Sequence, residues 1–161
     1  MSTRILIVDD DTDCARFLTE AIEAWGFEVV ATSNGREGLD MFNSMPIDGI
    51  CLDLEMPVMN GWTMLDELRW LGSGVPVIVM SKEADFAKLQ NFLMEGAQDY
   101  LVKPLNRLLL LQKLFRHFPW GMGAENRPAL FKDKPREVNV HQEKDALLAQ
   151  SGAWLSERKC D

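Results

Sequence analysis

Acidic side chains follow two apolar runs in the first third of the chain. Asp9 and Asp10 come directly after Ile5–Val8, and Asp53 comes directly after Gly49–Leu52. Carboxylates that are brought together repel one another and stay ionised only where a cation compensates them. Because carboxylate oxygens with room for water suit Mg²⁺ or Mn²⁺, the three residues are candidate metal ligands. An acidic run on its own would indicate only a solvated turn after a strand. The presence of Asp53 after a second apolar run is what favours a metal site.

Two further polar residues end later apolar runs and could assist phosphoryl chemistry. Ser81 follows 75–80, and Lys103 follows 100–102. A carboxylate beside a divalent metal can attack a phosphoryl group and form an aspartyl phosphate. The metal neutralises charge on the transferring oxygens, and a lysine ammonium supplies a second positive charge. The Ser81 hydroxyl can donate a hydrogen bond to the transferred group, so the set predicts a phosphoryl acceptor.

These residues must be positioned by the elements that precede them. Apolar runs alternate with amphipathic stretches up to about residue 118, which predicts five strand–helix units. Thr12 is the candidate cap of the first helix and Asn106 that of the last. The strands are expected at 5–8, 29–31, 49–52, 75–80 and 100–102, and the fourth helix at 86–94.

Strict alternation of strands and helices predicts an α/β fold of the doubly wound kind. Near-continuous apolar strands indicate a parallel sheet covered by helices on both faces. Such sheets place their sites outside the carboxyl ends of the strands, where every polar residue named above falls.

An ordered set of motifs in this sequence resembles the receiver domain of bacterial two-component response regulators. The motifs, which span about residues 3–118, are Ile5–Asp11, Asp53–Pro57 with Gly61, Val77–Ser81 and Gly96–Pro104. Each motif alone is weak, whereas the set in this order and at this spacing is highly specific. The resemblance implies a flavodoxin-like (βα)5 fold with five parallel strands in the order 2-1-3-4-5. It also implies a phosphoprotein of phosphorelay signal transduction.

The resemblance assigns roles at the acidic end of the set. Asp53 is the phosphoacceptor. The metal, Mg²⁺ or Mn²⁺, is bound by the side chains of Asp10 and Asp53 and by the backbone carbonyl of Glu55, while Asp9 acts mostly through water.

The resemblance also assigns the residues that stabilise and report the phosphoryl group. Lys103 contacts the group, and its peptide bond to Pro104 is cis. Ser81 follows the group on activation, and Tyr100 is an aromatic switch whose ring then moves inward. Such a switch is a two-state element biased by a local change of charge.

Two charged residues follow Ser81, of which the first departs from the family pattern and the second lies at a tuning position. The first position is usually small but here is Lys82, whose long cationic side chain either restricts access to the site or adds a favourable charge. Glu83 lies where the family tunes hydrolysis. For both residues, an ordinary solvated charge is the competing interpretation.

The function that follows is a phosphorylation-controlled response regulator rather than an enzyme, with only phosphoryl acceptance and autodephosphorylation as its chemistry. The phosphoryl donor is expected to be a sensor histidine kinase or a histidine phosphotransfer protein. A downstream protein is expected on the face formed by the fourth helix, fifth strand and fifth helix. Leu108 to Leu111 exceed what one buried helix face needs, so some should be exposed to a partner, a second copy in a homodimer, or the tail.

Charge and apolar content exclude several other classes. The net charge of −8 belongs to residues 1–118, and 119–161 are balanced, which argues against direct nucleic-acid binding. The apolar runs fall far short of the roughly 20 residues of a membrane span. No signal-peptide pattern opens the sequence, so a cytoplasmic location without membrane contact is expected.

A change of composition after Phe118 predicts the domain boundary. We expect a receiver domain over 1–120, and a linker and C-terminal tail over 121–161 with a short helix at 142–158. Prolines and glycines punctuate the start of this tail.

Two alternatives remain at this point. A receiver-like binding module could act without phosphate, although it would have no reason to hold acids together. An aspartate-nucleophile phosphatase shares a similar fold and an Asp-x-Asp start, but Asp13 replaces its usual threonine and no cap domain fits in 161 residues.

The boundary leads to a first prediction. Deletion of residues 124–161 should leave phosphorylation of the remaining domain intact, because the predicted core ends near Phe118. Mass spectrometry after treatment with acetyl phosphate and Mg²⁺ measures this, with the full chain as control. Loss of folding on deletion would instead make the tail part of the core.

Overall fold

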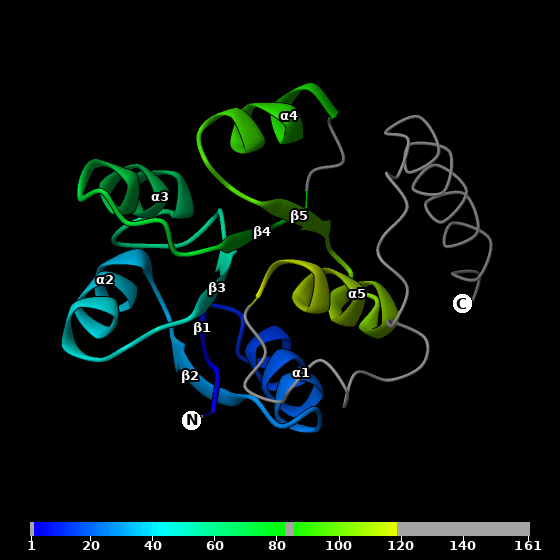
Figure 1. Ribbon diagram of the computed structural model, residues 1–161. Helices are drawn as coiled ribbons and strands as arrows, with labels where there is room; N and C mark the ends of the chain where they lie inside the picture. Colours follow the sequence, from blue (N-terminus) through cyan, green and yellow to red (C-terminus); the bar gives the residue numbers. More distant parts are fainter. Residues whose placement is uncertain (1, 83–85, 119–161) are drawn as a thin grey trace. The chain divides into compact units, whose positions relative to one another are not determined.

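The computed structural model describes residues 2–82 and 86–118, in which five strands alternate with five helices (Figure 1). The strands are β1 (Arg4–Val8), β2 (Glu28–Thr32), β3 (Gly49–Asp53), β4 (Val77–Ser81) and β5 (Asp99–Val102). The helices are α1 (Thr12–Glu23), α2 (Gly35–Ser44), α3 (Gly61–Trp70), α4 (Phe86–Met94) and α5 (Arg107–His117). Glu83, the tail over 121–161 and its expected helix at 142–158 lie outside the described residues.

All five strands are parallel and lie in the order β2-β1-β3-β4-β5, which confirms the predicted doubly wound fold. Every residue of β3 and β4 is buried, as expected for strands covered on both sides. Helices α1 and α5 cover one face, and α2, α3 and α4 cover the other (Figure 1). No helix among the described residues is long and apolar enough to cross a membrane.

Asparagine and aspartate side chains begin four of the helices. Asn34, Asn60 and Asn106 each accept a hydrogen bond from a backbone N–H of the first turn that follows. The prediction of Thr12 as the first cap is wrong, because the Asp11 carboxylate accepts hydrogen bonds from the backbone N–H groups of Asp13 and Cys14. The third acid of the 9–11 run therefore starts α1 instead of facing the other carboxylates.

Arg69 joins three segments at the edge of the sheet where strands begin. From α3, its guanidinium donates to the carbonyl oxygens of Gly96 (2.7 and 3.1 Å), Ser73 (2.9 Å) and Val75 (3.0 Å). These bonds satisfy the carbonyl groups of the loops that lead into β4 and β5. The network fixes the end of α3 relative to both strands.

Phe118, the last described residue, is buried against the first residue of β3. A Cβ atom on Gly49 would lie 2.7 to 2.8 Å from three atoms of the Phe118 ring, which is 3% exposed. Only glycine leaves room for the ring, so the core reaches at least to residue 118. The predicted boundary at 120 lies two residues beyond and stays a prediction.

Gly61 brings the start of α3 against the backbone of the residue predicted to be phosphorylated. A Cβ atom at Gly61 would lie 2.1 Å from the carbonyl oxygen of Asp53 and 2.9 Å from Cα of Leu54. The Gly61 N–H donates to the Leu54 carbonyl at 3.0 Å. Because the close atoms belong to the backbone, they cannot move aside as a flexible side chain would.

Substitution Gly61→Ala should lower the free energy of unfolding by about 2–4 kcal/mol, because the methyl group forces α3 away from β3. Urea unfolding measures the change. Gly74→Ala is the matched control, since nothing lies within 4 Å of the added Cβ there. Equal stability of the two variants would contradict the close approach.

Candidate functional site

Three carboxylates meet at the carboxyl ends of β1 and β3. One side-chain oxygen from each of Asp9, Asp10 and Asp53 lies within 4.8 Å of the others. Asp9 is 3% exposed and Asp53 is 4% exposed, whereas Asp10 is open to solvent. The structure thus brings together the residues that the sequence proposed as metal ligands. Glu55, the remaining proposed ligand, lies on the exposed loop after β3.

Lys103, at the end of β5, compensates the two buried carboxylates. Its Nζ atom lies 2.8 Å from Oδ2 of Asp9 and 3.3 Å from Oδ1 of Asp53, and its side chain is 9% exposed. Burial acts to lower the pKa of Lys103, but the hydrogen bond with Asp9 and the two carboxylate charges hold it above its usual value. The peptide bond to Pro104 is cis, as the resemblance implies.

Asp53 is nevertheless difficult to ionise in the absence of a further cation. Burial raises the pKa of its carboxyl to about 6, with the Lys103 charge acting to lower it and the Asp9 charge acting to raise it. One lysine therefore compensates the three carboxylates only in part. A divalent cation beside them would favour the ionised form.

A thiol that no sequence motif indicated also lies at this site. Cys14, from the first turn of α1, is half-buried and hydrogen-bonds to Asp9, and burial together with that bond raises its pKa to about 12. The thiol therefore stays neutral and adds no charge. Cys51 is fully buried in β3, and burial raises its pKa to about 12, so this second thiol is an unreactive part of the core.

The two residues proposed to report the phosphoryl group lie on the neighbouring strands β4 and β5. Ser81 is the last residue of β4 and is 6% exposed, while Lys82 after it is exposed. The Tyr100 ring on β5 is 7% exposed, and the Nζ atom of Lys113 lies 5.0 Å from its centroid. In this structure the aromatic side chain is thus already buried. Leu108 is 51% exposed, which confirms that part of the leucine run faces solvent.

An ion network that no sequence motif indicated lies beside Tyr100. Oδ1 of Asp99 accepts from Lys113 Nζ at 2.6 Å, and Oδ2 lies 2.8 Å from His117 Nε2. Burial acts to raise the pKa of Asp99, but the bond with His117 and the Lys113 charge hold it below its usual value. The spacing of Lys113 and His117, one turn apart on α5, was the only signal in the sequence.

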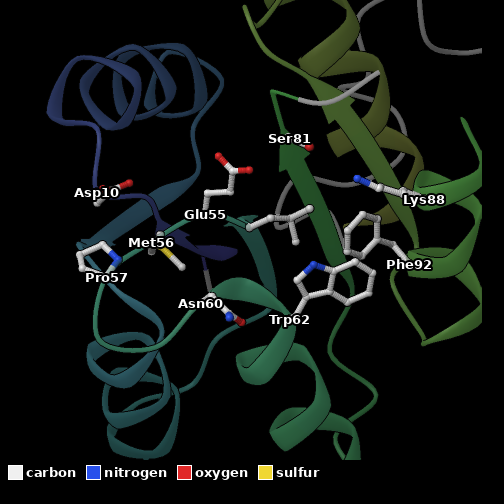
Figure 2. Close-up of a pocket in the computed structure, with 10 residues that line it drawn as sticks. Asp10, Glu55, Met56, Pro57, Asn60, Trp62, Ser81, Lys88 and Phe92 are labelled. Carbon is white, nitrogen blue, oxygen red and sulfur yellow. The ribbon is translucent and has the colours of Figure 1, made fainter. Parts of the chain in front are cut away.

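A cavity of about 690 Å³ lies beside the acidic edge (Figure 2). It runs from Asp10 and Glu55, past Ser81, to Trp62 of α3 and Lys88 of α4. No motif in the sequence indicates this cavity, because its walls come from segments that lie far apart along the chain.

The fold and the residues at this edge together define the class of the protein. A five-stranded parallel α/β sheet with clustered carboxylates at β1 and β3 and a buried lysine after β5 is the arrangement expected for receiver domains. The family model for the response regulator receiver domain matches residues 5–115, and the chain belongs to this family.

Curated relatives agree with the family but are longer. The regulatory protein AtoC of Escherichia coli is 34% identical over 147 residues, covering 79% of this chain and 32% of AtoC. The transcriptional regulatory protein PrrA of Mycobacterium tuberculosis is 39% identical over 103 residues, covering 64% of this chain and 44% of PrrA. The chain thus spans about a third of one relative and less than half of the other.

A solved structure agrees with the fold. The CheX–CheY–BeF3–Mg²⁺ complex of Borrelia burgdorferi contains a chain that is 30% identical, with a TM-score of 0.67. The match covers 70% of this chain and 87% of the solved one.

The raised pKa of Asp53 predicts a pH-dependent stability in metal-free protein. Between the ordinary carboxyl pKa near 4 and about 6, the folded protein binds more protons than the unfolded chain, so stability falls as pH rises. Across this window the wild type should lose on the order of 2–3 kcal/mol relative to Asp53→Asn. Urea unfolding of both proteins from pH 4 to 7 measures the difference, and parallel curves would contradict it.

Proposed function

We propose that this chain is a phosphorylation-controlled response regulator in which Asp53 accepts a phosphoryl group from a sensor histidine kinase or a histidine phosphotransfer protein. Membership of the receiver family supports control by phosphorylation. The observation that carries the proposal is the meeting of Asp9, Asp10 and Asp53 within 4.8 Å, with Lys103 between the two buried acids.

The donor set fits a hard divalent cation, Mg²⁺ or Mn²⁺. All candidate ligands are oxygens, two of the three side chains are buried, and one lysine does not balance their charge. We propose that Asp10, Asp53 and the backbone carbonyl of Glu55 hold the ion, with Asp9 acting through water. When bound, the ion would offset the negative charge of the transferring oxygens. The Mg²⁺ named for the Borrelia burgdorferi complex supports this choice.

The remaining residues of the edge would bind and report the phosphoryl group. Lys103 supplies a positive charge from the β5 side, and the Ser81 hydroxyl is placed at the end of β4, next to β3. Formation of aspartyl phosphate removes the Asp53 carboxylate from its pairing with Lys103, which changes the balance of charge beside Ser81 and Tyr100. We propose that this change alters the face formed by α4, β5 and α5, and that Lys82 and Glu83 set the lifetime of the phosphorylated form.

The described domain is proposed to act through protein contacts. Its acidic charge disfavours direct contact with nucleic acid, and Leu108 offers an exposed apolar position on the output face. The relative PrrA is named as a transcriptional regulatory protein, which stands partly against an output through protein contacts alone. If this chain had a similar role, its output would be DNA binding by a larger assembly. The comparisons give no support to a phosphatase or to a module that acts without phosphate.

Treatment with acetyl phosphate and Mg²⁺ should add one phosphoryl group to the wild type, and intact-mass spectrometry should detect it. Asp53→Asn should remain unmodified because the amide is not a nucleophile for this reaction. Asp40→Asn is the matched control, since Asp40 lies on the exposed surface of α2. Chelation of the metal should abolish labelling.

Two results would refute the proposed function. One is a wild type that stays unmodified at saturating donor and metal. The other is equal labelling of the wild type and Asp53→Asn.

A further inference from the structure

A lysine is almost fully buried beside the proposed aromatic switch. Lys113, on α5, is 5% exposed, and its Nζ atom lies over the Tyr100 ring, 5.0 Å from the ring centroid. A lysine loses its hydration when it is buried, and a buried ion pair contributes little more to stability than well-packed apolar side chains do. An apolar side chain would therefore serve packing as well, so the charge at this position must have another role.

Asp99, the first residue of β5, holds this lysine in place. Its Oδ1 atom accepts hydrogen bonds from Lys113 Nζ at 2.6 Å and from the backbone N–H of Tyr100 at 2.9 Å. Its Oδ2 atom lies 2.8 Å from Nε2 of His117, which follows Lys113 by one turn of α5. Because an ionised carboxylate only accepts hydrogen bonds, Nε2 of His117 is the donor. Both oxygens are thus occupied, which prevents the carboxylate from rotating away from the lysine.

The fixed lysine favours one position of the Tyr100 ring. A cation over the face of an aromatic ring is attracted to it, and the attraction is strongest where water is excluded. The ring residue is 7% exposed and Lys113 is 5% exposed, so little water weakens their contact. Since Asp99 holds the ammonium, the ammonium does not follow a ring that turns outward. The network therefore favours the buried ring through residues other than those of the phosphoacceptor edge.

We propose that Lys113 is a positioning residue, held over the Tyr100 ring by Asp99 and His117, and that this network sets the balance between the buried and the outward ring. The proposal rests on the proposed function, because the balance matters only if Tyr100 acts as a switch. It adds a control of the output face from α5. His117 is where this network meets solvent, since its side chain is 20% exposed, against 12% for Asp99 and 6% for Lys113.

The position of the ring can be measured directly, because Tyr100 is the single tyrosine of the sequence. Incorporation of 3-fluorotyrosine gives one ¹⁹F NMR signal, whose shift between H₂O and D₂O reports how far water reaches the ring. In the full chain without a phosphoryl donor, this isotope shift should be small in the wild type and larger in the double variant Asp99→Asn/Lys113→Met. The double variant removes both charges together and keeps the volume of both side chains, so the fold is retained.

Two substitutions at one position test His117. His117→Leu removes the hydrogen bond to Asp99, whereas His117→Gln keeps an N–H donor at that place. The isotope shift of the Tyr100 signal should increase in His117→Leu and return to the wild-type value in His117→Gln. Arg116→Gln is the matched control, because it removes an exposed cation from the neighbouring position of α5 and should leave the signal unchanged.

The effect on the switch can be measured with beryllofluoride, a mimic of the phosphoryl group. If Tyr100 is the switch, burial of its ring and binding of the mimic strengthen each other by the same factor. Loss of one desolvated contact between a cation and a ring changes the ratio of buried to outward ring about 5- to 30-fold. Beryllofluoride with Mg²⁺ should therefore bind the double variant more weakly than the wild type, by up to that factor. Titration followed by the ¹⁹F signal of bound beryllofluoride measures the affinity.

The outcomes separate this proposal from the proposed function. Equal isotope shifts in the wild type and the double variant would overturn the positioning role of Lys113, and equal shifts in His117→Leu and the wild type would overturn that of His117. Unequal shifts with equal affinity for beryllofluoride would overturn the control of the switch. A wild type that neither binds beryllofluoride nor is labelled by acetyl phosphate would instead overturn the proposed function, while the isotope shifts, which need no phosphoryl group, still report the ring.

Discussion

Crowding of negative charge at one edge of the sheet is the constraint on which the other features depend. Asp9 and Asp53 are almost fully buried, so water screens their repulsion poorly. The site tolerates them because Lys103 reaches both carboxylates and Cys14 hydrogen-bonds to one of them. This compensation leaves part of the negative charge unbalanced. Because of that remaining charge, the edge responds to a cation or to a change in the charge of Asp53.

The parallel sheet supplies the geometry that this charge balance requires. Strands β1, β3 and β4 are neighbours, and β5 pairs with β4, so their carboxyl ends meet at one edge. Local contacts then fix the position of α3 along the strands. Gly61 lets α3 start against the carbonyl of Asp53, and Arg69 secures the opposite end of the same helix. The acidic edge thus rests on a rigid support on the α3 side.

Much of this arrangement could be predicted from the sequence. The features that could not be predicted have one physical reason in common. The apolar runs and the acids, serine and lysine at their ends indicated the sheet and placed Asp53 beside Asp9. The strand ends can be predicted because apolar runs alternate regularly with amphipathic stretches, and because a parallel sheet brings the carboxyl ends of its strands to one edge. The Cys14 contact and the pairing of His117 with Asp99 depend on side-chain directions between elements, which the pattern of one segment does not encode. The cap at Asp11 was missed because Thr12, the next residue, is also a good capping type and the sequence does not show which of the two side chains turns back to the helix.

The packing of Phe118 against Gly49 determines where the chain leaves the described domain. Strand β3 carries Asp53 at one end and Gly49 at the other, so the chain leaves the described domain beneath the same strand that bears the phosphoacceptor, a strand's length of about 16 Å away. Whatever is joined after Phe118 is tethered at the base of the reactive strand and not beside its tip. The position of this one glycine thus sets how far from the reaction centre the chain leaves the described domain.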